Sequence, residues 1–342
     1  MSQGKCRVGN YNVKENDIRP KAIFDEYLKL SREDIDIYFR DRTEFLNVNC
    51  PACQSAKVHS SFTKDSFTYL ECECCETLYV SPRPPQKMID GYYKNSESSK
   101  YWATTFYKET EAVRREKLYR PKAQMIKSIV IKNGITPGAL LDIGAGYGTL
   151  CEELKALNFF KEVFAMEPSI YLSEVCRKKG LNVIESTIEK IDGENEAKFD
   201  IAVSLELFEH LFSVDSFLDA VSRALKPGGF FIFSTLSGTG WDILVLREHS
   251  NSVSPPHHVN FLNPHSIELL AERKGWRVVD LFTPGELDVD IVVNFARYNP
   301  SFELDRFTRE ILASGEKIQN AFQKFLVENR LSSHMWIVLQ KQ

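Results

Sequence analysis

The chain of 342 residues contains no apolar run that approaches the roughly 20 residues needed to span a bilayer. Its opening stretch, MSQGKCRVGN, lacks the hydrophobic region of a secretory signal. Internal repeats and low-complexity tracts are also absent from the sequence. We therefore expect a cytoplasmic protein with no membrane partner.

The sequence has little net charge, because 43 Lys and Arg stand against 47 Asp and Glu to give −4. The two signs are interspersed, and no long basic stripe is present, which argues against a general nucleic-acid or membrane-surface binder. Hydrophobic residues make up 43% of the chain, enough to bury a sizeable core in one large or two ordinary domains. This composition favours a globular protein that acts on small molecules, and it leaves the oligomeric state open.

Changes in residue composition and hydrophobic pattern divide the chain into four segments. Residues 1–45 are expected to form a helical leader, residues 46–85 a small cysteine-containing module, residues 86–134 a helical lid or linker, and residues 135–342 an α/β domain. The module ends at SPRPP, which cannot continue a helix or a central strand. The turn signals NG and PG at 133–138 precede the alternating apolar runs and helical stretches of the last segment.

Five of the eight cysteines lie within the short module. CPAC and CECC place two residues between Cys50 and Cys53 and two between Cys72 and Cys75, and eighteen residues separate the pairs. This is the spacing of a tetrahedral zinc site. A module of this size has too small a core to fold without such a metal. We expect a structural Zn²⁺ in a zinc-ribbon-like module, with Cys74 as a bystander; reduced cysteines without metal are the alternative.

A glycine-rich loop follows the apolar run in ALLDIGAGYGTL. Gly144, Gly146 and Gly148 allow the backbone to turn sharply and to approach a ligand closely, and Asp142 lies beside the turn. The dinucleotide fingerprint needs its third glycine one position later, where this chain has Thr149. The spacing favours S-adenosylmethionine over a dinucleotide, and a purely structural turn is the alternative.

The next expected strand, EVFAMEP, supports the same cofactor. It ends in Glu167, where an acid can accept both ribose hydroxyls of an adenosine. An acid at the end of each of two consecutive strands makes a structural turn a weaker explanation of the glycines.

Three further stretches carry a family resemblance: FDIAVSLELFEHL, LKPGGFFIFST and MWIVLQ. Together with the glycine loop, they resemble the class I S-adenosylmethionine-dependent methyltransferases over roughly residues 135–342. The resemblance implies a doubly wound, Rossmann-like α/β sheet with a late antiparallel strand at 335–340. It also implies a cofactor site made of Asp142, Gly144, Ala145, Gly146, Gly148, Glu167, Pro168 and Leu205.

The amino-terminal part resembles a narrower group in which a four-cysteine zinc module ending in Pro-Arg-Pro precedes the methyltransferase domain. Members of this group modify nucleotide sugars, surface polysaccharides or secondary metabolites. The stretch PPHHVNFLNPHSIELLAERKGW at 255–276 is similar to theirs. We expect the chain to differ from the zinc-containing sugar C-methyltransferases in their additional carboxyl-terminal domain, so their substrate does not transfer directly.

Candidate catalytic residues lie in LELFEHL and PPHHVNF. We expect Glu206, Glu209 and His210 to share one helical face and His258 to approach them from the loop after the fifth strand. Three interpretations stay open: a bound Mg²⁺ or Mn²⁺, as in metal-dependent O-methyltransferases that the E-x-x-E-H string resembles; a histidine or carboxylate acting directly on the acceptor; or structural bracing. We expect His257 and His265 to cap helices or to face solvent.

Acceptor-binding candidates precede the catalytic domain. Arg114, Arg115 and Arg120 would grip an anionic group if they are not simply a solvated helix face. Tyr101 and Trp102 would stack on a base or sugar if they are not core residues.

We expect an S-adenosylmethionine-dependent methyltransferase that acts on a small anionic or glycosyl acceptor, such as a hydroxyl of a nucleotide-linked sugar or glycan precursor. Two rivals are an RNA methyltransferase whose zinc module binds nucleic acid, which the acidic balance disfavours, and a binding protein that has lost its chemistry. The sequence does not distinguish oxygen, nitrogen and carbon as the methylated atom.

Overall fold

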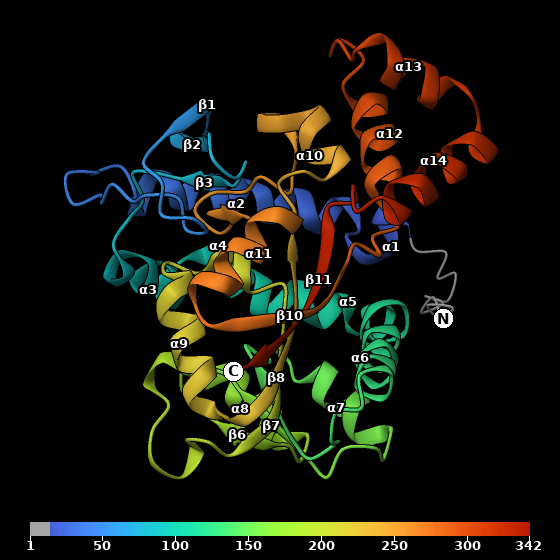
Figure 1. Ribbon diagram of the computed structural model, residues 1–342. Helices are drawn as coiled ribbons and strands as arrows, with labels where there is room; N and C mark the ends of the chain where they lie inside the picture. Colours follow the sequence, from blue (N-terminus) through green and yellow to red (C-terminus); the bar gives the residue numbers. More distant parts are fainter. Residues whose placement is uncertain (1–13) are drawn as a thin grey trace.

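The structure, a computed structural model, describes residues 14–342 (Figure 1). Residues 1–13, which include Cys6 and the first part of the expected leader, lie outside the described residues. Among the helices that are described, none has the length and apolar character to span a membrane.

Seven strands form one mixed sheet in the order β10-β11-β8-β7-β4-β5-β6. They are β4 (Ala139–Ile143), β5 (Glu162–Met166), β6 (Asn182–Ile184), β7 (Phe199–Leu205), β8 (Leu225–Leu236), β10 (Trp276–Phe282) and β11 (His334–Lys341). Strands β6, β5, β4, β7 and β8 are parallel, whereas β11 is antiparallel to both β8 and β10. This topology confirms the expected doubly wound α/β sheet with a late antiparallel strand.

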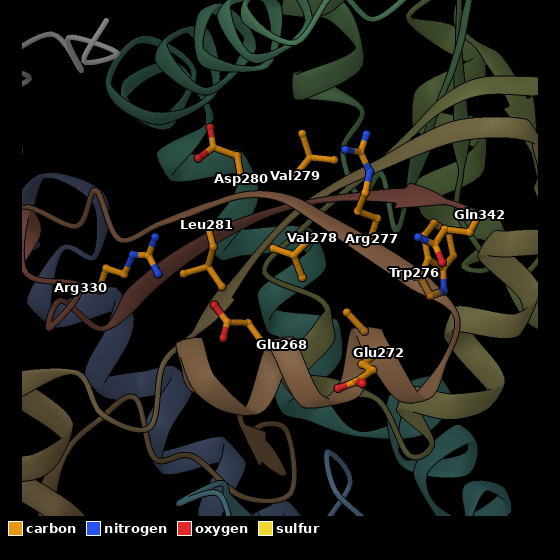
Figure 2. A pocket seen from close by; sticks show the side chains of 11 residues that line it. Glu268, Glu272, Trp276, Arg277, Val278, Val279, Asp280, Leu281, Arg330 and Gln342 are labelled. Carbon is orange, nitrogen blue, oxygen red and sulfur yellow. The ribbon is translucent and has the colours of Figure 1, made fainter. Parts of the chain in front are cut away.

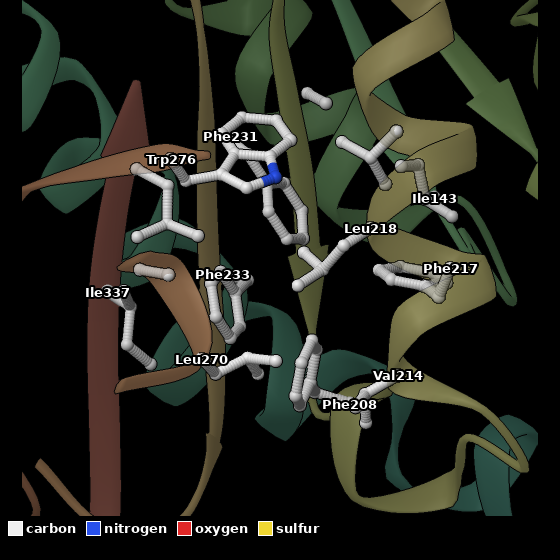
Figure 3. Packing of buried hydrophobic residues seen from close by; sticks show 14 of the residues in the cluster. Ile143, Phe208, Val214, Phe217, Leu218, Phe231, Phe233, Leu270, Trp276 and Ile337 are labelled. Atoms are coloured by element: carbon white, nitrogen blue, oxygen red, sulfur yellow. The ribbon is translucent and has the colours of Figure 1, made fainter. Parts of the chain in front are cut away.

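Alternate residues of the central strands point to opposite faces of this sheet and build two cores. In β8, Phe231 and Phe233 stack at 4.5 Å in the core under α9 (Val214–Ala224) and α11 (Pro264–Arg273), as Figure 3 shows. Ile232, between them, belongs to the core on the other face. Helices α6 (Arg120–Lys132), α7 (Thr149–Ala156) and α8 (Ile170–Lys178) contribute to that second core.

Local sequence explains where several helices begin. Ser169 and Ser213 each accept a hydrogen bond from the backbone N–H three residues later, at the starts of α8 and α9. Asn263 does the same for α11 in a capping box with Ser266. Single 3₁₀ turns cover Ile188–Lys190, Gly193–Asn195, Phe208–His210 and Arg247–His249.

The cysteine module contains β1 (Val58–Lys64), β2 (Phe67–Cys72) and β3 (Leu78–Val80). A fourth strand, β9 (Asn260–Phe261), comes from the C-terminal half of the chain and pairs with β3, so the antiparallel order is β1-β2-β3-β9. The sheet of the module therefore holds the segment that immediately follows His258.

Helices from the amino-terminal third pack around the module and the large sheet. They are α1 (Glu15–Ile18), α2 (Lys21–Tyr38), α3 (Gln86–Asn95), α4 (Glu97–Tyr101) and α5 (Tyr107–Arg114), with π-helical turns at Trp102–Phe106 and Arg115–Tyr119 on either side of α5. Asp34 on α2 accepts from the backbone N–H of Ser98 at 2.8 Å, and Tyr27 lies 4.6 Å from Trp102 between ring centroids. These contacts fix α2 against the helices of residues 86–134.

A second group of helices extends the C-terminal half. Helix α10 (Trp241–Leu246) follows β8, while α12 (Asp288–Tyr298), α13 (Arg306–Ala313) and α14 (Glu316–Glu328) lie between β10 and β11. Figure 1 shows α12, α13 and α14 together beside α10 and α1. Leu246, Val292 and Leu304 form their shared core. Our sequence analysis does not predict this helical group.

Candidate functional site

The glycine loop joins β4 to α7 at the carboxyl edge of the parallel strands. Gly144, Gly146 and Gly148 have φ angles of 78°, 55° and 71°, in the left-handed region that glycine adopts most readily. The backbone N–H groups of Gly144 and Ala145 donate to the carbonyl of Met166, at the end of β5, at 2.9 and 3.0 Å. The loop is thereby tied across the ends of two neighbouring strands.

Neighbouring residues approach the glycine loop so closely that a side chain at Gly144 or Gly146 would press against them. A Cβ at Gly144 would lie 3.0 Å from a methyl of Leu207, and a Cβ at Gly146 would lie 3.3 Å from the hydroxyl of Tyr107. Glycine at these positions lets the loop pack closely against Leu207 and Tyr107. This cradle fits the nucleoside and amino-acid parts of S-adenosylmethionine.

The two strand-end acids have different positions. Asp142 is buried behind the loop, where it accepts from the thiol of Cys151 at 3.3 Å, and burial raises its pKa to about 7. Glu167 accepts from the backbone N–H groups of Gly146 and Ser169, both at 2.9 Å. Burial raises the pKa of Glu167, and these two bonds counteract the increase. Each Glu167 oxygen keeps a second lone pair for a ribose hydroxyl.

Three further predicted cofactor residues surround the loop. Ala145 is partly buried within it, Pro168 is exposed directly after Glu167, and Leu205 is the last residue of β7. The structure therefore places all eight predicted cofactor residues along the ends of β4, β5 and β7.

The expectation that Glu206, Glu209 and His210 share a helical face is wrong. The backbone N–H of Glu206 donates to the carbonyl of Ser234, which continues the pairing of β7 with β8 beyond Leu205. Glu206 then takes a positive φ of 54°, and only a single 3₁₀ turn follows, at Phe208–His210. Strand pairing at this position prevents a helix from starting.

As a result, Glu206 is not part of the group that Glu209 and His210 form, although its charge acts on both. It accepts from the hydroxyl of Ser234 at 2.5 Å and pairs with Lys122 at 3.3 Å and His334 at 3.3 Å. Burial alone would raise the pKa of Glu206, but His334 and Lys122 together hold it well below its usual value. Glu206 is therefore an ionised carboxylate that pairs with Lys122 and contacts the ring of His334.

Glu209, His210 and His258 do come together. One ligand atom from each lies within 4.8 Å of the others, and the two imidazole centroids are 4.7 Å apart. Glu209 is buried and accepts from the hydroxyl of Thr235 at 2.9 Å. Burial, with the charge of Glu206 nearby, raises the pKa of Glu209 to about 8.

His258 is oriented by its own loop. Its Nδ1 lies 2.6 Å from the carbonyl of Ser252, and a carbonyl can only accept, so Nδ1 carries the proton and Nε2 has a free lone pair. Burial lowers the pKa of His258 to about 4, which keeps the ring neutral near pH 7. The hydroxyl of Tyr69, in the cysteine module, donates to the carbonyl of His258 at 2.9 Å.

The expectation that His257 caps a helix or faces solvent is also wrong. His257 is buried, with Nε2 2.8 Å from the hydroxyl of Tyr92 and Nδ1 3.2 Å from that of Tyr93. Tyr93 also lies 3.3 Å from Nδ1 of His210. His257 therefore anchors a tyrosine that bridges to the cluster, because α3 carries both tyrosines against this loop. His265, in contrast, is exposed on α11.

Of the three candidate arginines, Arg115 and Arg120 have acidic partners. Arg115 pairs with Glu152 at 2.5 Å and with Glu111 and Glu153, both at 3.1 Å. Arg120 pairs with Glu153 at 3.1 Å. Because these ion pairs neutralise Arg115 and Arg120, the placement favours their structural interpretation.

The two aromatic candidates lie in a small hydrophobic cluster. Trp102 stacks on Phe106 with centroids 4.0 Å apart, and Tyr101 packs against the same cluster, which includes Phe24 and Tyr27 of α2. This placement favours a core role for Tyr101 and Trp102.

Four of the module's cysteines form a compact group. Each offers one sulfur within 4.8 Å of the others: Cys50, Cys53, Cys72 and Cys75. The Cys50–Cys75 and Cys53–Cys72 sulfur separations are 3.5 Å, near the roughly 3.8 Å edge of a tetrahedron with Zn–S bonds of about 2.3 Å. Cys74 is exposed and contacts the hydroxyl of Ser55 instead. This donor set fits zinc.

A separate groove of about 570 Å³ lies along the edge strand β10 and α11 (Figure 2). Its lining includes Glu268, Arg277, Asp280 and Arg330, and none of the glycine-loop or histidine residues. The sheet order separates β10 from β4 by three strands, so this groove is distinct from the candidate site.

Sequence reasoning missed several residues of the site. Lys122 and His334 contact Glu206 from distant segments, and no local motif marks either one. Tyr93 lies within the expected helical lid, among aromatics that could stack on an acceptor, but its contact with His210 depends on the fold.

Comparisons with known proteins are consistent with this geometry. Residues 114–281 match the family model described as "Methyltransferase domain". The chain is 30% identical over 162 residues to the mitochondrial ubiquinone biosynthesis O-methyltransferase of Dictyostelium discoideum, covering 42% of this chain and 50% of that protein. It is 34% identical over 154 residues to the ubiquinone biosynthesis O-methyltransferase of Brucella anthropi, covering 41% and 60%.

The matched segments thus span only part of the length of these relatives. Among solved structures, the Burkholderia thailandensis 1,6-didemethyltoxoflavin-N1-methyltransferase is similar with a TM-score of 0.48 and 13% identity, covering 84% of this chain and 100% of that one. The family match lies on the segment that contains the glycine loop and the Glu209–His210 turn. The match to this family model covers residues 114–281, just under half of the chain.

Proposed function

We propose that the protein transfers a methyl group from S-adenosylmethionine to an oxygen of a small-molecule acceptor. The observation that carries this proposal is the glycine cradle at the end of β4, with Glu167 beside it and a neutral histidine cluster after β7. The names of the similar proteins, O-methyltransferases, support oxygen as the methylated atom.

Methyl transfer is an in-line displacement, so the protein must align the acceptor, exclude water and remove the proton of a hydroxyl. S-adenosylmethionine would supply the electrophilic methyl, held by the glycine loop and Glu167. His258 presents an unprotonated and oriented Nε2 that would take the hydroxyl proton. The Nδ1 proton stays hydrogen-bonded to the carbonyl of Ser252, and this bond fixes the orientation of the ring.

A divalent cation is the second mechanism that an observation favours. Glu209, His210 and His258 offer three ligand atoms within 4.8 Å of one another, a set that suits Mn²⁺ better than Mg²⁺ because two of the atoms are imidazole nitrogens. Glu206 would not be a ligand, since its carboxylate is occupied by Lys122 and His334. Such an ion would lower the pKa of an acceptor hydroxyl.

The four-cysteine group is proposed to hold one structural Zn²⁺. Four thiolates leave no open coordination position, so this site has no place for a substrate. Its contribution would be to hold the module, and with it β9 and the histidine loop.

The test is methyl transfer from labelled cofactor to a panel of nucleotide sugars and phenolic metabolites, with mass spectrometry of the products. The assay is run with and without a chelator strong enough to remove Mn²⁺ but not thiolate-bound zinc. Loss of activity on chelation supports the cation mechanism, and full activity supports His258 acting directly. Failure to bind S-adenosylhomocysteine in calorimetry would refute the proposed function.

A further inference from the structure

Two arginines near the candidate site have no acidic partner. Arg19 and Arg114 make no ion pair with any carboxylate in residues 14–342, although the neighbouring Arg115 and Arg120 do. Both side chains are partly buried. A partly buried guanidinium without an anion is costly, so such a pair indicates a place for an anionic ligand.

Arg114 lies in an aromatic setting that leaves its guanidinium available. Its Cζ is 5.7 to 5.9 Å from the ring centroids of Phe106, Tyr107 and Tyr119. One terminal nitrogen reaches the carbonyl of Ile18 at 3.5 Å, and the buried Nε has no hydrogen-bond partner among the described residues. The rings, with a side-chain hydrogen bond to Tyr119, hold the group in place, and no carboxylate pairs with it among the described residues.

Arg114 also faces the cofactor cradle. It lies seven residues after Tyr107, so the two share one face of α5. The Tyr107 hydroxyl is the group that a Cβ at Gly146 would meet. The π-helical turns at both ends of α5 set the direction of this face, and such turns occur often at functional sites.

Arg19 reaches the same region from α1. It is the residue that ends α1, and Arg114 contacts the carbonyl of the residue before it. Burial lowers the pKa of Arg19, and the adjacent charge of Arg114 acts in the same direction, whereas the charges of Glu15, Glu206 and Asp242 oppose this without forming an ion pair. The charge of Arg19 also lowers the pKa of His258. Arg19 is thus within electrostatic range of both Glu206 and His258.

We propose that Arg19 and Arg114 together bind a phosphate group carried by the methyl acceptor. The inference rests on the proposed function, because it places that phosphate beside the groups that would receive the methyl acceptor. Two unpaired guanidinium groups close to each other match the two negative charges of a phosphate and its oxygen geometry better than the single charge of a carboxylate.

The test is calorimetric titration of inorganic phosphate into the full-length protein saturated with S-adenosylhomocysteine, at constant ionic strength. Wild-type protein is expected to bind one phosphate, and Arg114→Gln and Arg19→Gln are each expected to weaken that binding roughly tenfold or more, as for a lost charge-assisted hydrogen bond. Arg120→Gln is the matched control, because Arg120 lies on the same run and is paired with Glu153. Acetate is titrated in parallel.

Several outcomes would overturn the inference: no phosphate binding by wild-type protein, equal weakening in Arg120→Gln, or tighter binding of acetate than of phosphate. The affinity of each variant for S-adenosylhomocysteine shows that it is folded, and Arg114→Lys, which keeps the charge, should retain part of the phosphate affinity. If wild-type protein fails to bind S-adenosylhomocysteine, the proposed function fails. If that ligand binds and phosphate does not, only the phosphate site fails.

Discussion

Carboxyl groups of similar chemistry have different states in this site because their surroundings differ. Glu206 is held ionised by His334 and Lys122, whereas burial raises the pKa of Glu209 to about 8. Asp142, buried behind the glycine loop, also has a raised pKa, to about 7. Only Glu167 has both oxygens on backbone N–H groups at the open side of the loop. These differences assign the cofactor contact to Glu167.

Replacing Glu167 by alanine should therefore weaken binding of S-adenosylhomocysteine roughly 10- to 100-fold, about 1.5–3 kcal/mol, as for lost hydrogen bonds to a charged group. Calorimetry measures the affinity. Glu162→Ala is the control, since Glu162 is exposed at the opposite end of β5 and should bind normally. An unchanged affinity in Glu167→Ala would refute the assigned cofactor site.

His258→Ala should lower kcat by about 10² or more, because it removes the acid–base group or a cation ligand. His265→Ala is the control, since His265 is exposed on the following helix. The measurement is the initial rate at saturating cofactor, with the acceptor that the screen identifies. If His258→Ala retains wild-type kcat, the histidine cluster is only structural.

At the residue scale, the sequence located this site through local signals. The glycine spacing and the strand-end acids predict the cofactor residues, because each signal lies within one strand and its following turn. The orientation of Glu206 depends on Ser234, Lys122 and His334, which lie far away in the sequence. His257 was misjudged for the same reason, since its tyrosine partners lie on α3.

Among the elements, the junction of α10 with α12 contains a buried acidic pair. Asp242, in the first turn of α10, has no hydrogen-bond partner for either carboxyl oxygen among the described residues. Asp288, at the start of α12, accepts from Ser332 and from the backbone N–H of Ser333, both at 2.6 Å. Burial, together with the charge of Asp288, raises the pKa of Asp242 well above its usual value.

A raised pKa in the folded state means that folding is favoured below the unfolded pKa and that this contribution is lost as pH rises. Asp242→Asn should therefore be more stable than wild type at pH 7.5, with Tm higher by roughly 2–4 °C, the change that about 1 kcal/mol produces in domains of 150–250 residues. The advantage should disappear near pH 4. Thermal unfolding across this pH range measures the effect.

Asp288→Asn is the contrasting variant, because it weakens the acceptor of the Ser332 and Ser333 bonds and should lower Tm at every pH. A constant difference between Asp242→Asn and wild type from pH 4 to 7.5 would contradict the proposed titration.

The doubly wound sheet with its late antiparallel strand was predictable, whereas the helical group between β10 and β11 was not. Parallel strands with intervening helices produce a strong alternating pattern, and LKPGGFFIFST and MWIVLQ carry it. The amphipathic stretches of α12, α13 and α14 bury their apolar residues against one another and against α10, so their place depends on contacts outside each segment.

For the molecule as a whole, the cysteine module and the histidine loop form one unit. Besides the β3–β9 pairing, the backbone N–H of Val80 donates to the carbonyl of Val259 at 3.0 Å, and the side chain of Asn263 donates to the carbonyl of Cys75 at 2.7 Å. We therefore expect a structural change in the cysteine module to displace the loop that carries His258.

We expect one zinc per chain, lost in Cys72→Ser and retained in Cys74→Ser. Loss of the metal should lower kcat tenfold or more through displacement of the histidine loop, while the affinity for S-adenosylhomocysteine changes less, because the glycine loop is built on β4 and β5. Elemental analysis and calorimetry measure the two effects. Zinc retained in Cys72→Ser and lost in Cys74→Ser would show that the ligand set is wrong.

The position of β11 has a consequence for synthesis on the ribosome. β11 is the last strand along the described chain, yet it lies between β8 and β10 and carries the His334 that pairs with Glu206. While the chain is emerging, β10 has no neighbour to pair with, and Glu206 lacks its contact with His334. The nascent protein can therefore assemble its glycine loop early, but the acceptor side of the site is completed only when the final strand is inserted.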